Sequence, residues 1–219
     1  MFGEAADPDG IVVRSLTLKS AAQGGRQTLV AAAPIEKVRR TLQMTASCGL
    51  RAVSVDHEAC VLARASQLPL LDVGLERSTL VAANDGVPVV RSFELGGAFF
   101  SDAMAREFVT SLTVAEVRKR TIGLGGAATE SVHAYIRALA LQTEGIAFDS
   151  PPRLYVCGNG ARLASLREQI AETLCLRVVP ADVGNLVESD LPREVMVSGG
   201  YDWFGAIAAA LPRVRGKAA

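Results

Sequence analysis

Three β-rich runs joined by short turns occupy residues 68–97 and constrain the fold more than any other part of the sequence (LPLLDVGLERSTLVAANDGVPVVRSFELGG). The first run ends in Asp72-Val73-Gly74, and runs over residues 78–83 and 87–95 follow it. Strands joined by tight turns predict a meander. A carboxylate and a glycine at a strand end also allow backbone amides to approach a phosphate. The stretch therefore fits both a nucleotide site and an ordinary meander.

The composition is that of a globular protein of one sizeable domain or two small ones. The chain has 219 residues, of which 49% are hydrophobic, and its formal net charge is zero. It carries no basic stripe for nucleic acid. No apolar run reaches the roughly 18 residues of a membrane span, and the N-terminal segment lacks the pattern of a signal peptide. We therefore expect a cytoplasmic protein that does not bind nucleic acid. The basic cluster Arg118-Lys119-Arg120 is interpreted as a solvated helix end.

The segment before the meander is expected to alternate between strands and helices. Strands are predicted over residues 11–18 and 27–33 from their β-rich composition. A helix is then expected to begin at Pro34 and to end at Gly49, because proline suits a first helical position and glycine a C-cap. A short strand over residues 51–55 and a helix over residues 56–65 follow in this prediction.

The segment after the meander is expected to complete an α/β layer structure with a sheet core. The predicted elements are a helix over residues 98–120 broken near Thr110-Ser111, a joint over residues 123–126, a helix over residues 128–142, a strand over residues 153–157, a helix through Leu163 and Leu174, a strand at residues 178–179 and a terminal helix over residues 201–211.

Two turns are candidate phosphate sites. The first holds Asp72 and Gly74 with Ser78 and Thr79; the carboxylate would hold Mg²⁺ through water, and the turn amides would face phosphate oxygens. The second is the run Gly158-Asn159-Gly160-Ala161 between a strand and a helix, where glycines admit a ligand and a helix N-terminus favours an anion. At each turn a tight connection without a ligand is the alternative.

Taken together, these segments resemble the actin-like ATPase superfamily and, within it, the PilM-like proteins of type IV pilus assembly, which are related to FtsA. The resemblance covers most of residues 11–211 and is carried by residues 29–34, 50–65, 71–97, 154–174 and 203–211. It implies that Asp72, Gly74 and Thr79 match the second phosphate motif of the family. Gly158, Gly160 and Ala161 match its adenosine motif, in which Asn159 replaces a third glycine.

The resemblance implies a truncated actin-like (ribonuclease H-like) α/β fold, with a mixed sheet flanked by helices and a small N-terminal α/β subdomain. The expected division is a subdomain over residues 11–55, an actin-like domain over residues 56–211 with a reduced helical subdomain over residues 98–150, and flexible ends at residues 1–10 and 212–219. The family's first phosphate motif precedes all the matched segments and is not found in this sequence. We therefore expect little or no hydrolysis, and the sequence identifies no catalytic residue.

The function implied by the resemblance is that of a cytoplasmic scaffold in a type IV pilus or related secretion machine. The chain would dock the N-terminal cytoplasmic peptide of a bitopic inner-membrane pilus protein, with residues 27–53 lining the docking surface, and would lie at the inner membrane through that partner. Two alternatives stay open. One is an active actin-like ATPase or sugar-kinase-like phosphotransferase that binds ATP and Mg²⁺. The other is a homo-oligomer or second chain that completes the phosphate site.

Overall fold

The chain divides into two compact units. The computed structural model describes residues 3–6, 10–19, 26–65, 69–84, 87–124 and 128–211. One unit comprises Met1–His57 with Asp85–Val87, and the other comprises Glu58–Asn84 with Pro88–Ala219. We call them unit 1 and unit 2. The expected flexible segment 212–219 lies outside the described residues. No helix in the described ranges is both long enough and apolar enough to cross a membrane.

Unit 1 contains an antiparallel sheet in the order β1-β2-β3. Its strands are β1 (Gly3–Ala6), β2 (Ile11–Lys19) and β3 (Arg26–Pro34). Two of these strands are as the sequence predicts, whereas β1 lies in a segment expected to be flexible. Helix α1 (Ile35–Ser47) begins directly after Pro34, whose φ of −57° suits a helix start. Gly49, with φ of +72°, follows its last turn.

The strand predicted over residues 51–55 is wrong. Residues 50–57 form neither helix nor strand, and the Val53 side chain is 89% exposed. An extended segment becomes a strand only where a neighbouring strand accepts and donates its backbone hydrogen bonds. Within the described residues the three strands of unit 1 pair with one another and none pairs with this segment.

Unit 2 is built on a mixed five-stranded sheet, as the sequence predicts, in the order β6-β5-β4-β7-β8. The strands are β4 (Leu70–Val73), β5 (Ser78–Asn84), β6 (Val87–Phe93), β7 (Arg153–Cys157) and β8 (Arg177–Pro180). Strand β4 is antiparallel to β5 and parallel to β7, which is parallel to β8. The expected meander therefore forms three of the five strands, and the predicted strand over residues 153–157 lies next to it, between β4 and β8.

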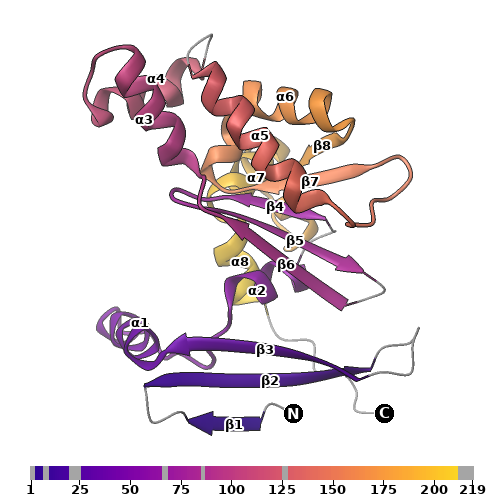
Figure 1. Ribbon diagram of the computed structural model, residues 1–219. Helices are drawn as coiled ribbons and strands as arrows, with labels where there is room; N and C mark the ends of the chain where they lie inside the picture. The colour runs from indigo at the N-terminus through magenta and orange to yellow at the C-terminus, as the bar shows by residue number, and fades with distance from the viewer. Residues whose placement is uncertain are drawn as a thin grey trace. The chain divides into compact units, whose positions relative to one another are not determined.

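Two hydrophobic cores cover the two faces of this sheet, and Figure 1 shows the helices that flank it. The flanking helices are α2 (Glu58–Ala65), α3 (Gly97–Glu107), α4 (Leu112–Ile122), α5 (Thr129–Thr143), α6 (Ala164–Leu174), α7 (Arg193–Asp202) and α8 (Phe204–Ala210). Because side chains alternate along a strand, Leu71 packs in the core with α3, α5 and α6, whereas Leu70 packs in the core with α2, α7 and α8.

Of two predictions on where helices break, one is confirmed and one is wrong. The long helix expected over residues 98–120 is indeed interrupted at Thr110-Ser111, where the Ser111 side chain accepts a hydrogen bond from the Val114 amide and caps α4. The single terminal helix expected over residues 201–211 is wrong, because α7 and α8 meet at Trp203. Helix α7 runs through Gly199-Gly200, a pair that the sequence does not mark as helical.

Candidate functional site

The two candidate phosphate turns lie at the same edge of the unit 2 sheet. Strands β4 and β7 are parallel neighbours, and Asp72 lies opposite Cys157 in their register. The turns that begin at Gly74 and Gly158 therefore follow adjacent strand ends. The carboxyl ends of neighbouring parallel strands are a common location for ligand sites in α/β sheets.

Close packing between these turns explains two of the predicted glycines. A Cβ at Gly158 would lie 2.3 Å from Asp72 Oδ1 and 2.6 Å from the Val73 carbonyl oxygen, and its φ is +83°. A Cβ at Gly160 would lie 2.3 Å from Val73 Cγ1. Ala161, the last residue of the run, is buried. Glycine is thus required here by the contact between two strand ends, with or without a ligand.

The turn after β4 is hydrogen-bonded to the start of α3. The Gly97 amide donates to the Gly74 carbonyl oxygen at 2.8 Å, and the Ala98 amide donates to the Leu75 carbonyl oxygen at 2.8 Å. A Cβ at Gly96 would lie 2.5 Å from that Leu75 oxygen. The first amides of α3 are therefore engaged by the turn, which fixes Gly74 in place.

Asp72 lies in an environment that disfavours its charge. Burial and the negative charge of Glu58 together raise the pKa of this carboxyl to about 6, although a hydrogen bond with Cys157 opposes the rise. Burial and the same neighbouring carboxylates raise the pKa of the Cys157 thiol. Within the described residues no group of three or more His, Cys, Asp or Glu side chains is placed to hold a metal ion.

The two hydroxyl residues of the first turn point to different partners. Ser78 is fully buried, and its hydroxyl donates to the Leu95 carbonyl oxygen at 2.7 Å and lies 2.8 Å from the Tyr135 hydroxyl. The Thr79 hydroxyl lies 3.1 Å from that of Ser92 on β6. Both groups therefore have protein partners within the sheet and its core.

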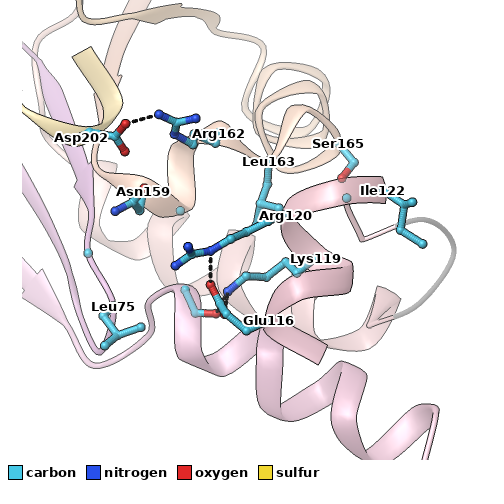
Figure 2. A pocket seen from close by; sticks show the side chains of 14 residues that line it. Leu75, Glu116, Lys119, Arg120, Ile122, Asn159, Arg162, Leu163, Ser165 and Asp202 are labelled. Atoms are coloured by element: carbon cyan, nitrogen blue, oxygen red, sulfur yellow. Dashed lines mark hydrogen bonds and ion pairs between the residues drawn. The ribbon is translucent and has the colours of Figure 1, made fainter. Parts of the chain in front are cut away.

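A cavity of about 890 Å³ opens beside these turns (Figure 2). Its described lining consists of Gly74, Leu75, Gly97, Glu116, Lys119, Arg120, Ile122, Gly123, Asn159, Gly160, Arg162, Leu163, Ser165 and Asp202. Three of the predicted site residues, Gly74, Asn159 and Gly160, are in this set. The predicted Asp72, Ser78, Thr79, Gly158 and Ala161 are not. The volume falls within the range of small-molecule pockets.

Helix α4 supplies charged groups to the cavity that the sequence interpretation missed. Lys119 is only 6% exposed, and its ammonium group donates to the Gly97 carbonyl oxygen at 2.8 Å and to the Ser101 hydroxyl at 2.6 Å. It also pairs with Glu116 at 2.6 Å, and Arg120 pairs with the same carboxylate at 2.8 Å. The interpretation as a solvated helix end is therefore wrong for Lys119. The spacing of Glu116 to Lys119 and Arg120, three and four residues, indicates that the ion pairs can form on one helix face, but it does not indicate that Lys119 is buried.

The charge of Glu116 is stabilised by these partners. Desolvation on its own raises the pKa of the carboxyl, but hydrogen bonds from Lys119, Ser101 and Arg120 lower it to about 2. Glu116 is therefore ionised at neutral pH and presents fixed acceptor oxygens at the cavity wall.

The opposite wall carries a second ion pair. Arg162, from the 3₁₀ helix η1 (Asn159–Arg162), pairs with Asp202 at the end of α7. Figure 2 shows the Arg162 and Arg120 guanidinium groups at the cavity, with Asn159 in the same view. Two guanidinium planes from separate elements can stack on a planar ring or donate to an anion.

Solved structures identify the fold. The sequence matches no protein-family model and no curated protein. A structure described as the PilM–PilN type IV pilus biogenesis complex superposes with a TM-score of 0.72 at 26% identity, over 94% of this chain and 67% of that chain. The chain therefore has a PilM-like, actin-like fold. The ethanolamine utilization protein EutJ from Carboxydothermus hydrogenoformans shares the fold, with a TM-score of 0.55 at 14% identity over 82% of this chain and 83% of that chain.

The strand ends and the cavity together make this sheet edge of unit 2 the candidate site of the chain. The two turns predicted from the sequence do meet there, but only part of each faces the cavity. The charged side chains of the lining come chiefly from α4 and η1.

Proposed function

We propose that this chain is an assembly component of a type IV pilus or related secretion machine and binds an inner-membrane partner of the PilN type. The observation that carries the proposal is its likeness to the PilM–PilN complex structure, at 26% identity over 94% of the chain. In this role the chain acts as a cytoplasmic scaffold that meets the membrane through its partner.

The proposed docking surface lies in unit 1, over residues 27–53. Several large apolar side chains are open to solvent there, including Val30 at 58%, Met44 at 63% and Val53 at 89% exposure. Strand β3 is an outer strand of its described sheet, so one of its edges can accept another strand. Apolar side chains next to an open edge suit an amphipathic peptide bound by strand or helix contacts. We propose that the partner contributes such a peptide from its N-terminal cytoplasmic tail.

Fluorescence anisotropy with a labelled peptide of the partner's cytoplasmic tail tests the docking surface. We expect Val53→Ser to weaken binding about tenfold or more, because burial of a valine side chain contributes about 1.5 kcal/mol or more. Val109→Ser is the matched control, since Val109 is 93% exposed but lies in unit 2. Equal losses in both variants, or no binding of the unaltered protein at high micromolar peptide, would count against the proposal.

Nucleotide binding is a second candidate function, supported by the cavity beside Gly74 and Gly160. Its volume suits a nucleotide, Arg120 and Arg162 can stack on a base, and Glu116 can accept hydrogen bonds from sugar hydroxyls. The cavity is less suited to a magnesium ion than to the base and sugar, because Asp72 is not part of the described lining and its pKa is raised to about 6. The residues thus suit the base and sugar of ATP better than a magnesium–phosphate group, and we propose little or no hydrolysis.

Calorimetry with Mg·ATP tests this second function. We expect Arg120→Ala and Arg162→Ala each to weaken binding, whereas Asp72→Ala should abolish it only if the carboxylate holds Mg²⁺ through water. Arg137→Ala on α5 is a suitable control, because Arg137 is exposed and is not part of the cavity lining. Absence of binding would remove nucleotide binding and leave the assembly role untouched.

Self-association is proposed only as a route to complete the phosphate site. Light scattering of the purified chain, with and without Mg·ATP, measures it. A strict monomer under both conditions would exclude a homo-oligomeric half-site.

A further inference from the structure

Four arginine side chains line a second hollow in unit 2, of about 620 Å³. They are Arg120 from α4, Arg162 from η1, Arg167 from α6 and Arg193 from α7. We call this hollow the arginine site. One acidic residue, Glu194, also lines it. Arg120 and Arg162 border the 890 Å³ cavity as well, whereas Arg167 and Arg193 are not part of its described lining.

The positive charge of this site is only partly neutralised by the protein. Arg162 pairs with Asp202, and Arg120 pairs with Glu116. Arg167 donates to two neutral groups, the Ala161 carbonyl oxygen at 2.9 Å and the Tyr201 hydroxyl. Arg193 makes no hydrogen bond or ion pair with another described side chain. Two guanidinium groups therefore face the hollow without a carboxylate partner among the described residues.

A tyrosine ring holds two of the arginines in place. The guanidinium carbons of Arg162 and Arg167 lie 5.8 Å and 5.3 Å from the centroid of the Tyr201 ring. Such contacts stabilise each cation, but they also keep like charges close together, which costs Coulomb energy. Hydrogen-bond donors that are already held in place lose little conformational freedom when an anion binds, so the arrangement lowers the entropic cost of binding.

The arrangement of donors indicates the chemistry of the ligand. A planar carboxylate is satisfied by one bidentate guanidinium. Guanidinium groups that approach one hollow from different elements suit a group whose acceptor oxygens point in several directions, which is the geometry of a phosphoryl group. We propose that the arginine site binds the phosphoryl group of a small anion, independently of the partner and nucleotide functions proposed above.

Titration calorimetry with inorganic pyrophosphate at low salt tests the proposal. We expect binding to weaken about tenfold in Arg193→Gln and in Arg167→Gln, as hydrogen bonds to charged groups contribute about 1.5–3 kcal/mol each. Arg137→Gln removes the same charge from the exposed face of α5 and should leave the affinity within about twofold. Citrate, which offers carboxylates only, should bind more weakly than pyrophosphate.

Several outcomes would overturn the proposal. Unchanged affinity in both Arg193→Gln and Arg167→Gln would place the anion elsewhere, for example in the 890 Å³ cavity that these residues do not line. Equal losses in Arg137→Gln would show a response to net charge alone. Tighter binding of citrate, or no pyrophosphate binding in the millimolar range, would exclude a phosphoryl site. Arg167 also contacts Tyr201 and Ala161, so Arg167→Gln counts as a test only if its thermal melting point matches that of the unaltered protein. If the melting point is lower, Arg193→Gln alone decides, because Arg193 lies at the exposed start of α7.

Discussion

Asp72 is a carboxyl group whose two roles conflict. Its place at the end of β4 suits a metal or phosphate contact, but burial and the nearby charge of Glu58 favour its protonated form. The neutral carboxyl stabilises the fold by meeting the backbone of the Gly158 turn without charge, whereas a bound cation would need the charged form.

The pH dependence of stability distinguishes these roles. The pKa of Asp72 is about 6 in the folded protein and 3.8 in the unfolded chain, so folding favours the proton. Its contribution is fully present below about pH 4 and is lost as the pH rises through about 6. We expect Asp72→Asn to raise the free energy of unfolding at pH 8 by up to about 3 kcal/mol and to change it much less at pH 4. Urea denaturation at both pH values measures the difference.

Glu58→Gln is the control for this effect. Removing the neighbouring carboxylate should lower the pKa of Asp72 and so reduce the loss of stability between pH 4 and pH 8. If Asp72→Asn destabilises the protein at pH 8, the carboxylate is charged and satisfied there, and the interpretation as a buried neutral group is wrong.

Lys119 and Arg120 pair with the same carboxylate but differ in burial, which predicts different effects on stability. Lys119 is 6% exposed and Arg120 is 69% exposed. Removing one partner of a buried pair typically costs about 3–5 kcal/mol; since Glu116 is itself 30% exposed, we expect about 2–3 kcal/mol for Lys119→Met. Arg120→Gln should cost less than about 1 kcal/mol. Urea denaturation compares the two, and equal costs would contradict the burial of Lys119.

At the scale of elements, much of the fold of unit 2 follows from local signals in the sequence. The meander, the strand Arg153–Cys157 and the break before α4 were predicted because turn residues and capping residues mark them. Helix α7 was not predicted, because Ser198-Gly199-Gly200 is a poor helix-forming sequence. The glycines are needed there for a tertiary contact, which local sequence does not reveal. A Cβ at Gly200 would lie 1.8 Å from the Ala181 carbonyl oxygen, so the glycine permits close approach of α7 to the strand end of β8.

The candidate site, too, could be predicted only where local sequence signals mark it. Its two glycine turns could be found from the sequence, since strand–glycine–helix connections are local. The buried ammonium of Lys119 could not, because its partners Gly97 and Ser101 come from α3 and become neighbours only when α3 packs against α4. Charge patterns in a sequence do not distinguish a solvated helix end from a cavity wall until that pairing is known.

Replacing glycine by alanine should change the stability of the protein in opposite directions at two positions. Gly158→Ala meets Asp72 Oδ1 at 2.3 Å and requires a left-handed backbone, so we expect it to cost about 2 kcal/mol or more. Gly205→Ala in α8 has no neighbour within 4 Å and should stabilise the protein by about 0.5–1 kcal/mol through its lower unfolded-state entropy. Thermal and urea denaturation give both values. A neutral Gly158→Ala would mean that the two strand ends are not packed together.

At the scale of the whole molecule, helices of the two units differ in how many side chains they bury. Hydrogen exchange should detect this difference, and it should also detect binding of the partner. Helix α1 has no buried residue, whereas α5 buries Val132, Tyr135, Ile136 and Leu139. Local opening is easier where few side chains are buried, so we expect amides of α1 to exchange much faster than those of α5. Saturation with the partner's cytoplasmic peptide should then slow exchange over residues 30–50 and leave α5 unchanged, because the proposed docking surface lies in unit 1. A peptide of scrambled sequence is the control, and protection confined to unit 2 would contradict the docking surface while leaving the fold unaffected.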